Sequence, residues 1–428
     1  MPEEPRQEIP RPKLRQTLGA LLDRLTTPPV LGWYAVLNLA VLIVVGVLNM
    51  HQTVSPIDPE GTRVVTGDYL AFLTGARILA QGQGAALYDL ALQKTMQESL
   101  AGIALETWQP FVNPPLLAIA MRPLADLPFA AGFRLFAAVT VGAGMLGCLA
   151  LLGSLGTLRR TRWQGATAAA LVLGFHPIAT TMLGRQNTTL TLGLLCGALW
   201  ALQHRHDVLA GLLIGLLSFK PQYMLAVCAL LAWQRCWRPL AAAAAVCLLH
   251  YGAGALLLSP AWPLDMLAAL GRYSPAEWAQ SGATHFSLFA FFRYTVGGMP
   301  GTVLASLSVL IAILACINFA PAVSPGDRNF PLTWALVIVA GMLASPHLQY
   351  YDFGILVLPV AIAVDAMLRA DRSPGTTLRV ALAVAYLGYA GFSEAGPALG
   401  FQPLTLWTVA LLYWLCRLGR VASVARGP

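Results

Sequence analysis

Long apolar runs alternate with short polar connections along most of the chain. The first run, Val30–Leu48, is long enough to cross about 30 Å of hydrocarbon, so we expect a retained membrane span there. Further apolar runs occupy residues 111–125, 130–153, 163–182, 187–203, 208–219, 221–234, 239–258, 286–296, 301–320, 331–344, 350–368, 376–392 and 402–416. This pattern predicts an all-α polytopic membrane protein with about twelve transmembrane helices.

The longest polar stretch, residues 49–110, follows the first span. Two segments in it, Tyr69–Ala80 and Leu90–Leu105, have helical patterns with one apolar side. Both are too short and too polar to span, so we expect amphipathic helices that lie flat on the outer membrane surface.

Composition supports a membrane protein. Hydrophobic residues make up 57% of the chain and charged residues only 11%, against about 25% charged residues in soluble domains. This excludes a water-soluble enzyme, a disordered scaffold and a secreted disulfide domain. The net charge of +8 does not indicate nucleic acid, because the basic residues form short clusters between apolar runs, as in cytoplasmic loops.

Those basic clusters set the predicted topology. We expect a cytoplasmic basic tail at 1–29, one transmembrane domain at 30–420 with its first periplasmic loop at 49–110, and a cytoplasmic C-terminal tail at 421–428. The protein would be a multi-pass protein of the inner membrane. The region 111–153 leaves two possibilities: its first run is a short re-entrant piece, or both of its runs cross and the topology departs from the positive-inside rule.

The unusual polar residues then all fall on the outer side, and polar groups at membrane depth are functional candidates. Asp68 stands directly before the helical pattern at Tyr69. A carboxylate within hydrogen-bond reach of a hydroxyl can act as a general base. The alternative is a helix N-cap.

Lys220 interrupts an apolar run and precedes Pro221. The other lysines, Lys13 and Lys94, lie in the tail and in the first loop, so Lys220 is the only lysine of the membrane region. A buried ammonium needs an anionic partner, which favours a phosphate-binding role. The alternative is a lysine that snorkels at a span end.

Two further groups complete the candidates. Arg185-Gln186-Asn187 offers many hydrogen-bond donors at the start of a helix, where an anion or a sugar could bind; the alternative is an ordinary polar turn. His347 and His285 could donate to a phosphate or carry a proton, or could be interfacial residues among aromatics.

Other groups are weaker candidates. Asp58 and Glu60 have the spacing of an acidic metal-binding pair, but Pro59 separates them. His176 and His250 are expected to be packing residues. The seven cysteines have no metal-binding spacing, and we expect them to be small buried hydrophobic residues. We therefore expect no metal and no cofactor.

Several motifs in one order resemble a known family. They are Asp68-Tyr69, Gly84-Ala85-Ala86-Leu87-Tyr88-Asp89, Phe111-Val112-Asn113-Pro114-Pro115-Leu116, Pro123-Leu124-Ala125-Asp126-Leu127-Pro128, Gly184-Arg185-Gln186-Asn187, Phe219-Lys220-Pro221 and Ser345-Pro346-His347. This order resembles glycosyltransferase family 87, which includes the polyprenyl-phosphate-mannose-dependent α-1,2-mannosyltransferases and has the GT-C membrane fold. The chain departs from the family pattern at Arg185, an insertion, and at Asn113, where an aromatic residue is common.

The resemblance implies a function. A sugar, mannose first, would move from a polyprenyl-phosphate donor to a hydroxyl of a glycolipid or glycan acceptor on the periplasmic face, with inversion. Asp68 would be the general base, and Lys220 and His347 would neutralise the departing phosphate. Arg185, Gln186, Asn187, His285, Tyr69 and Asn113 would help to bind the substrates.

Two other classes remain open from sequence alone. A lipid or sugar transporter would also have many spans, but such proteins usually have repeated halves with paired broken helices. Here Lys220-Pro221 predicts one strong helix break, and the sequence shows no corresponding break in a second, repeated half. A non-catalytic assembly protein would not need an acid, a lone lysine and a histidine on one side of the membrane.

Overall fold

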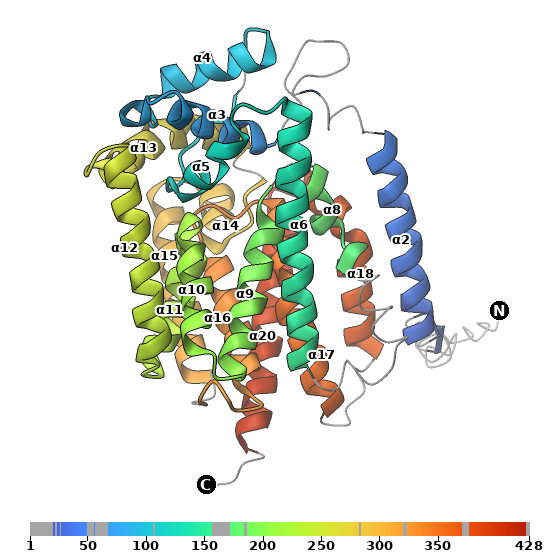
Figure 1. Cartoon of the computed structure of the whole chain (residues 1–428). Coiled ribbons are helices and arrows are strands. Elements are labelled where there is room, and N and C mark those ends of the chain that lie inside the picture. Colours follow the sequence, from blue (N-terminus) through green and yellow to red (C-terminus); the bar gives the residue numbers. More distant parts are fainter. Residues whose placement is uncertain are drawn as a thin grey trace, which may run out of the picture.

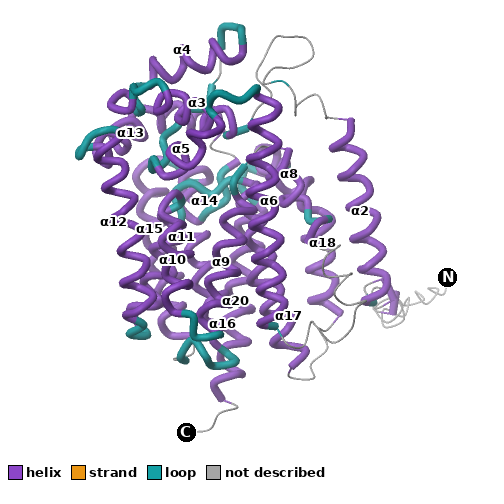
Figure 2. The backbone as a smooth tube through the Cα atoms, in the orientation of Figure 1, coloured by secondary structure: helices purple, strands orange, loops and turns teal. Residues whose placement is uncertain are grey.

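The computed structural model of the chain describes a helical protein (Figures 1 and 2). It describes residues 20–21, 24–25, 27–48, 55, 67–105, 108–155, 172–183, 186–281, 284–319, 323–369 and 376–424. Within these ranges the regular elements are α-helices and short 3-10 helices, and a single isolated β-bridge joins His285 to Gln349.

Most of the helices run side by side as a bundle (Figure 1). They are α2 (Pro28–Leu48), α6 (Phe129–Ser154), α9 (Thr188–Gln203), α10 (Asp207–Leu216), α11 (Pro221–Trp233), α12 (Trp237–Leu257), α15 (Gly298–Phe319), α16 (Phe330–Ala344), α17 (Val357–Arg369), α18 (Thr376–Glu394) and α20 (Pro403–Val424).

Four segments in the described ranges are long and apolar enough to cross a membrane. They are Phe129–Ser154, Trp237–Leu257, Gly298–Asn318 and Tyr350–Arg369, and several shorter apolar helices pack among them. The protein is therefore a membrane protein whose described residues form helices as their only regular elements. The expected number of about twelve spans and the GT-C fold stay predictions.

A layer of four helices covers one end of the bundle, at the top of Figure 1. It contains α3 (Tyr69–Ala80), α4 (Leu90–Ala101), α5 (Leu116–Met121) and α13 (Trp262–Ser281). We call these four helices the cap layer. The remaining short elements are α8 (His176–Leu183), α14 (Leu288–Thr295), α19 (Gly396–Leu399) and the 3-10 turns η2 (Gly84–Ala86), η3 (Arg122–Leu124), η4 (Leu217–Phe219) and η6 (Tyr350–Leu356).

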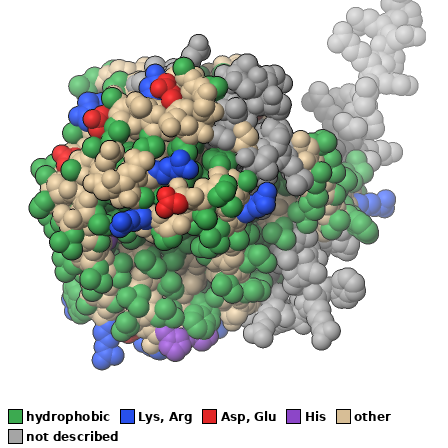
Figure 3. All heavy atoms as spheres, turned by 45° about the horizontal axis from the view of Figure 1, so that its top comes forward, with side chains coloured by type: hydrophobic (Ala, Val, Ile, Leu, Met, Phe, Trp, Pro, Cys, Tyr) green, Lys and Arg blue, Asp and Glu red, His purple; other side chains and the backbone are tan. Residues whose placement is uncertain are grey.

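The distribution of side chains on the outer surface differs between the bundle and the cap layer. Figure 3 turns the cap layer toward the viewer: the side of the molecule is largely hydrophobic, whereas acidic and basic side chains gather on the capped end and at the lower edge. Large apolar side chains such as Leu146, Leu256 and Ile311 are exposed along α6, α12 and α15. Exposed apolar surface of this extent is typical of helices that face lipid.

The predicted runs match the helices closely, with two differences. In the ambiguous region 111–153, the first run forms only α5 and η3, and α6 alone is long enough to cross, which favours a single crossing. Between the predicted runs 239–258 and 286–296, where no apolar run was predicted, the chain forms α13, a helix with Pro275 inside it. Much of the run expected at 163–182 lies outside the described residues.

The helix at Tyr69–Ala80 is present with the predicted bounds, but it does not lie on the surface as expected. Nearly all its residues are buried, including Tyr69, Phe72 and Ile78. Its sequence, YLAFLTGARILA, is apolar on almost every side, and such a helix is buried rather than interfacial. The length of α3 correctly indicated that this helix does not span the membrane. Its apolar composition indicated that it belongs to the core.

Buried amide side chains hold the cap layer together. Gln93 of α4 donates from Nε2 to the carbonyl of Phe111, at 3.1 Å, and its Oε1 accepts from the Phe111 N–H at 2.7 Å. His250 of α12 links the layer to the bundle, since its Nε2 accepts from the Leu116 N–H at 2.9 Å. His250 thus has the structural role that the sequence predicted.

Helices α6 and α9 approach each other through glycines. A Cβ atom on Gly147 would lie 2.5 Å from the Cα of Gly193, and one on Gly193 would lie 2.3 Å from the carbonyl oxygen of Ala143. Small residues that allow backbones to meet are a common basis of helix packing in membranes. Because α9 begins at Thr188, beside Gln186 and Asn187, this contact also fixes the start of α9.

We expect Gly147→Ala to destabilise the protein, because the added methyl group meets backbone atoms that cannot move aside. The expected cost is about 1–3 kcal/mol, as for overpacked cores. Thermal unfolding in detergent measures it. Gly142→Ala on the same helix is the matched control, since no atom lies within 4 Å of its added Cβ. Equal melting temperatures for the two variants would contradict the close approach.

Candidate active site

Asp68 is the residue immediately before α3, and its carboxylate does not cap that helix. Its backbone has helical angles, φ −60° and ψ −12°, and its side chain forms no capping hydrogen bond. A capping side chain normally requires an extended N-cap residue. The N-cap alternative therefore does not account for the Asp68 carboxylate.

The Asp68 carboxylate faces groups from three other segments. Gln186 hydrogen-bonds to it, and the Tyr351 hydroxyl donates to its Oδ2 in a long bond of 3.4 Å. Burial raises the pKa of Asp68 above its ordinary value of 3.8, and nearby Asp352 adds to this, whereas the bond from Gln186 and the charges of His347 and Lys220 oppose it. A carboxylate with a raised pKa is a stronger base at neutral pH.

Lys220 lies at a break between two apolar helices. Helix α10 ends in the 3-10 turn η4, and Pro221 begins α11 as its first residue, where a missing N–H costs no hydrogen bond. Lys220 itself has non-helical angles, φ −127° and ψ 74°. The break carries its side chain inward, where its Nζ lies 2.6 Å from Asp352 Oδ1 and 5.8 Å from the ring centre of Tyr351.

Asp352 is the anionic partner that the sequence analysis required but did not name. It is 2% exposed, and it accepts hydrogen bonds from the Thr188 hydroxyl at 3.2 Å and from the Gln349 N–H at 3.3 Å. Isolated buried carboxylates are costly, whereas paired and hydrogen-bonded ones are not. The signal for it was available, because Asp352 is an acidic residue at the start of an apolar run.

The two candidate histidines contact each other directly. His285 Nε2 lies 3.2 Å from His347 Nδ1 and 3.1 Å from the Gln349 amide nitrogen. The backbone aligns them, since the Phe286 N–H donates to the Leu348 carbonyl at 2.9 Å. His285 is fully buried and stacks on Trp278, whereas His347 is exposed. His347 is thus the histidine that is open to a ligand.

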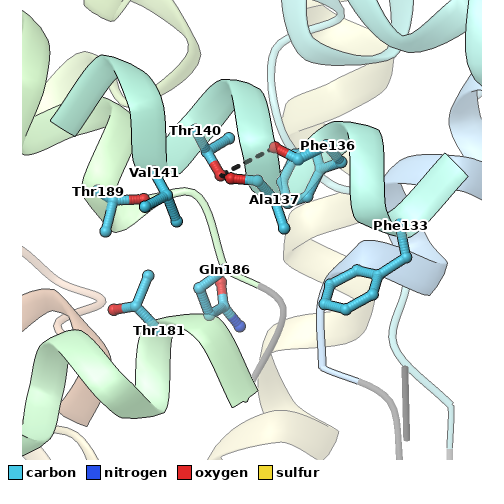
Figure 4. Close-up of a pocket in the computed structure, with 8 residues that line it drawn as sticks. All are labelled: Phe133, Phe136, Ala137, Thr140, Val141, Thr181, Gln186 and Thr189. Carbon is cyan, nitrogen blue, oxygen red and sulfur yellow. Dashed lines mark hydrogen bonds between the residues drawn. The ribbon is translucent and has the colours of Figure 1, made fainter. Parts of the chain in front are cut away.

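Gln186 and Asn187 are both buried at the start of α9, and Gln186 hydrogen-bonds to Asp68. Gln186 also lines a small pocket between α6, α8 and α9, together with Phe133, Phe136, Ala137, Thr140, Val141, Thr181 and Thr189 (Figure 4). In the described part of the chain, Asn187 Oδ1 and Thr189 Oγ1 are buried without a hydrogen-bond partner. Arg185 lies outside the described residues.

Tyr69 and Asn113 have packing and backbone contacts. Tyr69 is fully buried among Phe129, Phe133 and Phe136 of α6, with ring centres 5.2–5.4 Å away. Asn113 accepts through its carbonyl from the Tyr88 hydroxyl at 2.9 Å, within the loop that Gln93 holds. These contacts are structural, and direct contact of either residue with a substrate stays a prediction. Asp58 and Glu60, the weak metal candidates, lie outside the described residues.

The site thus combines a carboxylate, an ammonium and a histidine from distant segments, at the capped end of a membrane bundle. Comparison with known families identifies the class. The model of glycosyltransferase family 87 matches residues 111–346. The chain belongs to this family, and it is therefore a membrane glycosyltransferase rather than a transporter. Neither a curated protein nor a solved structure matches the chain.

We expect the loss of one partner of the buried Lys220–Asp352 pair to destabilise the folded protein far more than the loss of both partners. Lys220→Met leaves a buried carboxylate unpaired, which costs about 3–5 kcal/mol, whereas Lys220→Met with Asp352→Leu removes both charges. The melting temperature should fall clearly in the single variant and recover in the double variant.

Lys94→Met is the control for this experiment. Lys94 pairs with Glu98 at 3.7 Å, but its side chain is 43% exposed, so the loss of that pair should change stability by less than about 1 kcal/mol. A double variant of Lys220 and Asp352 as unstable as the single variant would contradict the ion pair.

Proposed function

We propose that this glycosyltransferase transfers a sugar from a polyprenyl-phosphate donor to a hydroxyl of a lipid or glycan acceptor, with mannose as the first sugar to test. Asp68 acts as the general base, and the reaction inverts the anomeric carbon. The capped end of the bundle faces the outside of the inner membrane, and both chain termini lie in the cytoplasm. The single observation that carries this proposal is the Asp68 carboxylate, free of a capping bond and close to the only lysine of the bundle.

The reaction is a single displacement. Asp68 takes the proton of the acceptor hydroxyl while the acceptor oxygen forms a bond to the anomeric carbon. The bond between that carbon and the phosphate oxygen breaks, and its electron pair leaves with the polyprenyl phosphate. A base with a raised pKa suits this step, because it holds the transferred proton more strongly.

Lys220 and His347 suit the leaving phosphate. An ammonium has three donors, and in the described structure one of them points to Asp352. The remaining donors of Lys220 can bind phosphate oxygens, and the exposed ring of His347 can donate a further hydrogen bond. Donors fixed before the reaction stabilise the developing negative charge without rearrangement, which is often the largest catalytic effect.

The sugar would bind beside α9. Gln186, Asn187 and Thr189 lie at its start, and the buried oxygens Asn187 Oδ1 and Thr189 Oγ1 have no partner in the described residues. Hydroxyl groups of a sugar can donate to both atoms. Buried polar atoms are nearly always hydrogen-bonded, so a polyhydroxylated ligand at this position would supply what the chain itself does not.

Asp68→Asn should abolish transfer, because the amide cannot accept the hydroxyl proton. The expected loss is about 10²–10⁴-fold, the usual contribution of a general base. The assay follows transfer from polyprenyl-phosphate mannose to a lipid extract by mass spectrometry, with purified protein in lipid. Because Asp68 does not cap α3, the variant should unfold at nearly the wild-type temperature. If a folded Asp68→Asn variant transfers sugar as fast as the wild type, Asp68 is not the general base.

We expect EDTA to leave transfer unchanged, because Lys220 and His347 supply the positive charge that a metal would otherwise bring to the phosphate. Transfer rates are compared in EDTA and after addition of Mg²⁺ or Mn²⁺. Activity lost in EDTA and restored by either metal would refute the proposal that Lys220 and His347 neutralise the phosphate without a metal. Asp58 and Glu60 would then be the residues to test as metal ligands.

A further inference from the structure

Four consecutive residues, Gln349 to Asp352, each contact a titratable side chain from another segment. Gln349 contacts His285, Tyr350 contacts His176, Tyr351 donates to Asp68, and Asp352 pairs with Lys220. They begin the 3-10 helix η6, which has three residues per turn and therefore points successive side chains in widely different directions. We call Gln349–Asp352 the positioning turn.

The positioning turn is itself held in place. The Gln349 side chain and Asp352 form a capping box at its start, and the Gln349 N–H donates to Asp352 Oδ2 at 3.3 Å. Thr188 at the start of α9 donates to the other oxygen, Oδ1, at 3.2 Å. Asp352 therefore bonds at once to its own turn, to α9 and to Lys220. A side chain with this many bonds has little freedom to move.

We propose that Tyr351 and Asp352 are positioning residues for the reaction: Tyr351 orients the Asp68 carboxylate, and Asp352 keeps the Lys220 ammonium away from that carboxylate. The inference rests on the function proposed above and assigns two residues that the motif comparison did not single out. Its physical basis is that a base and an ammonium at one site attract each other. Without a competing anion, Lys220 would pair with Asp68 and occupy the oxygen that must accept a proton.

The groups around Asp68 allow the proposed roles of Tyr351 and Asp352 to be tested separately. Asp68 faces Lys220 from the α10–α11 break, His347 from the segment before η6, and Tyr351 and Asp352 from η6, with the neutral amide of Gln186 beside it. His285 lies behind His347. Loss of the Tyr351 hydroxyl removes a donor to the ionised carboxylate. Loss of the Asp352 charge removes a like charge and releases Lys220 toward Asp68. The first change disfavours the ionised base and the second favours it.

The test is the acidic limb of kcat/KM against pH, which reports ionisations of the free enzyme. Tyr351→Phe should move this limb upward by about 0.5 to 1 pH unit, the size expected for one lost hydrogen bond. Asp352→Asn should move it downward by about 1 unit and lower kcat about tenfold, because a base paired with Lys220 is weaker.

Tyr350→Phe is the matched control. It removes the same hydroxyl from the neighbouring residue of the same turn, but Tyr350 contacts His176, outside the Asp68 group. Its acidic limb should stay where the wild-type limb lies. Asp352→Glu restores the charge if Asp352→Asn fails to fold, and its limb should move back toward the wild-type position.

The outcomes are distinct. Opposite shifts for Tyr351→Phe and Asp352→Asn, with none for Tyr350→Phe, support the inference. Lower melting temperatures without any shift of the limb would overturn it and leave both residues with a purely structural role. Shifts of both variants in the same direction would also overturn it. Transfer by wild type that Asp68→Asn fully retains, or no transfer from any polyprenyl-phosphate sugar, would instead refute the proposed function, and the inference with it.

Discussion

The site depends on the buried ion pair between Lys220 and Asp352. An ammonium and a carboxylate that are both largely removed from water are stable only while they remain paired and hydrogen-bonded. This requirement fixes the break between α10 and α11 relative to η6, although the two are far apart in sequence. Tyr351 connects this pair to Asp68, because its ring lies 5.8 Å from the Lys220 ammonium and its hydroxyl donates to the Asp68 carboxylate. The position of the Asp68 carboxylate and the packing of the bundle are therefore linked through Tyr351.

The cap layer provides the other half of the site. Asp68 directly precedes a helix that is buried rather than laid on a membrane surface, so the position of its carboxylate is set by core packing. Gln93 and His250 satisfy the backbone of the neighbouring loop, which has no regular partner of its own. The candidate catalytic groups thus meet where the cap layer packs on the bundle. Such a boundary suits an enzyme whose donor would be partly lipid and partly polar.

Much of the fold could be predicted from hydrophobic periodicity, because a span must be apolar over a fixed length. Runs such as 130–153 and 239–258 differ from their helices by only one or two residues. The burial of α3 differs from the prediction, because a helix too short to span can still be apolar enough to pack in the core. Lys220, His347 and Gln186 were predicted as candidates because they are polar residues between apolar runs that all fall on one side of the predicted topology. Asp352 could have been noted as an acidic residue at the start of an apolar run, but its pairing with Lys220 and the bond from Tyr351 to Asp68 join segments far apart in sequence, which no local pattern reveals.

In the proposed function, the phosphate of a polyprenyl-phosphate donor binds at Lys220 and His347, with the sugar beside Asp68. A cryo-EM structure of the protein in lipid with bound polyprenyl phosphate would test this binding mode. We expect phosphate oxygens within about 3 Å of Lys220 Nζ and near the His347 ring, with Asp68 on the side where the sugar would lie. A phosphate bound at another end of the bundle, or against helices that do not contact Asp68, would contradict it.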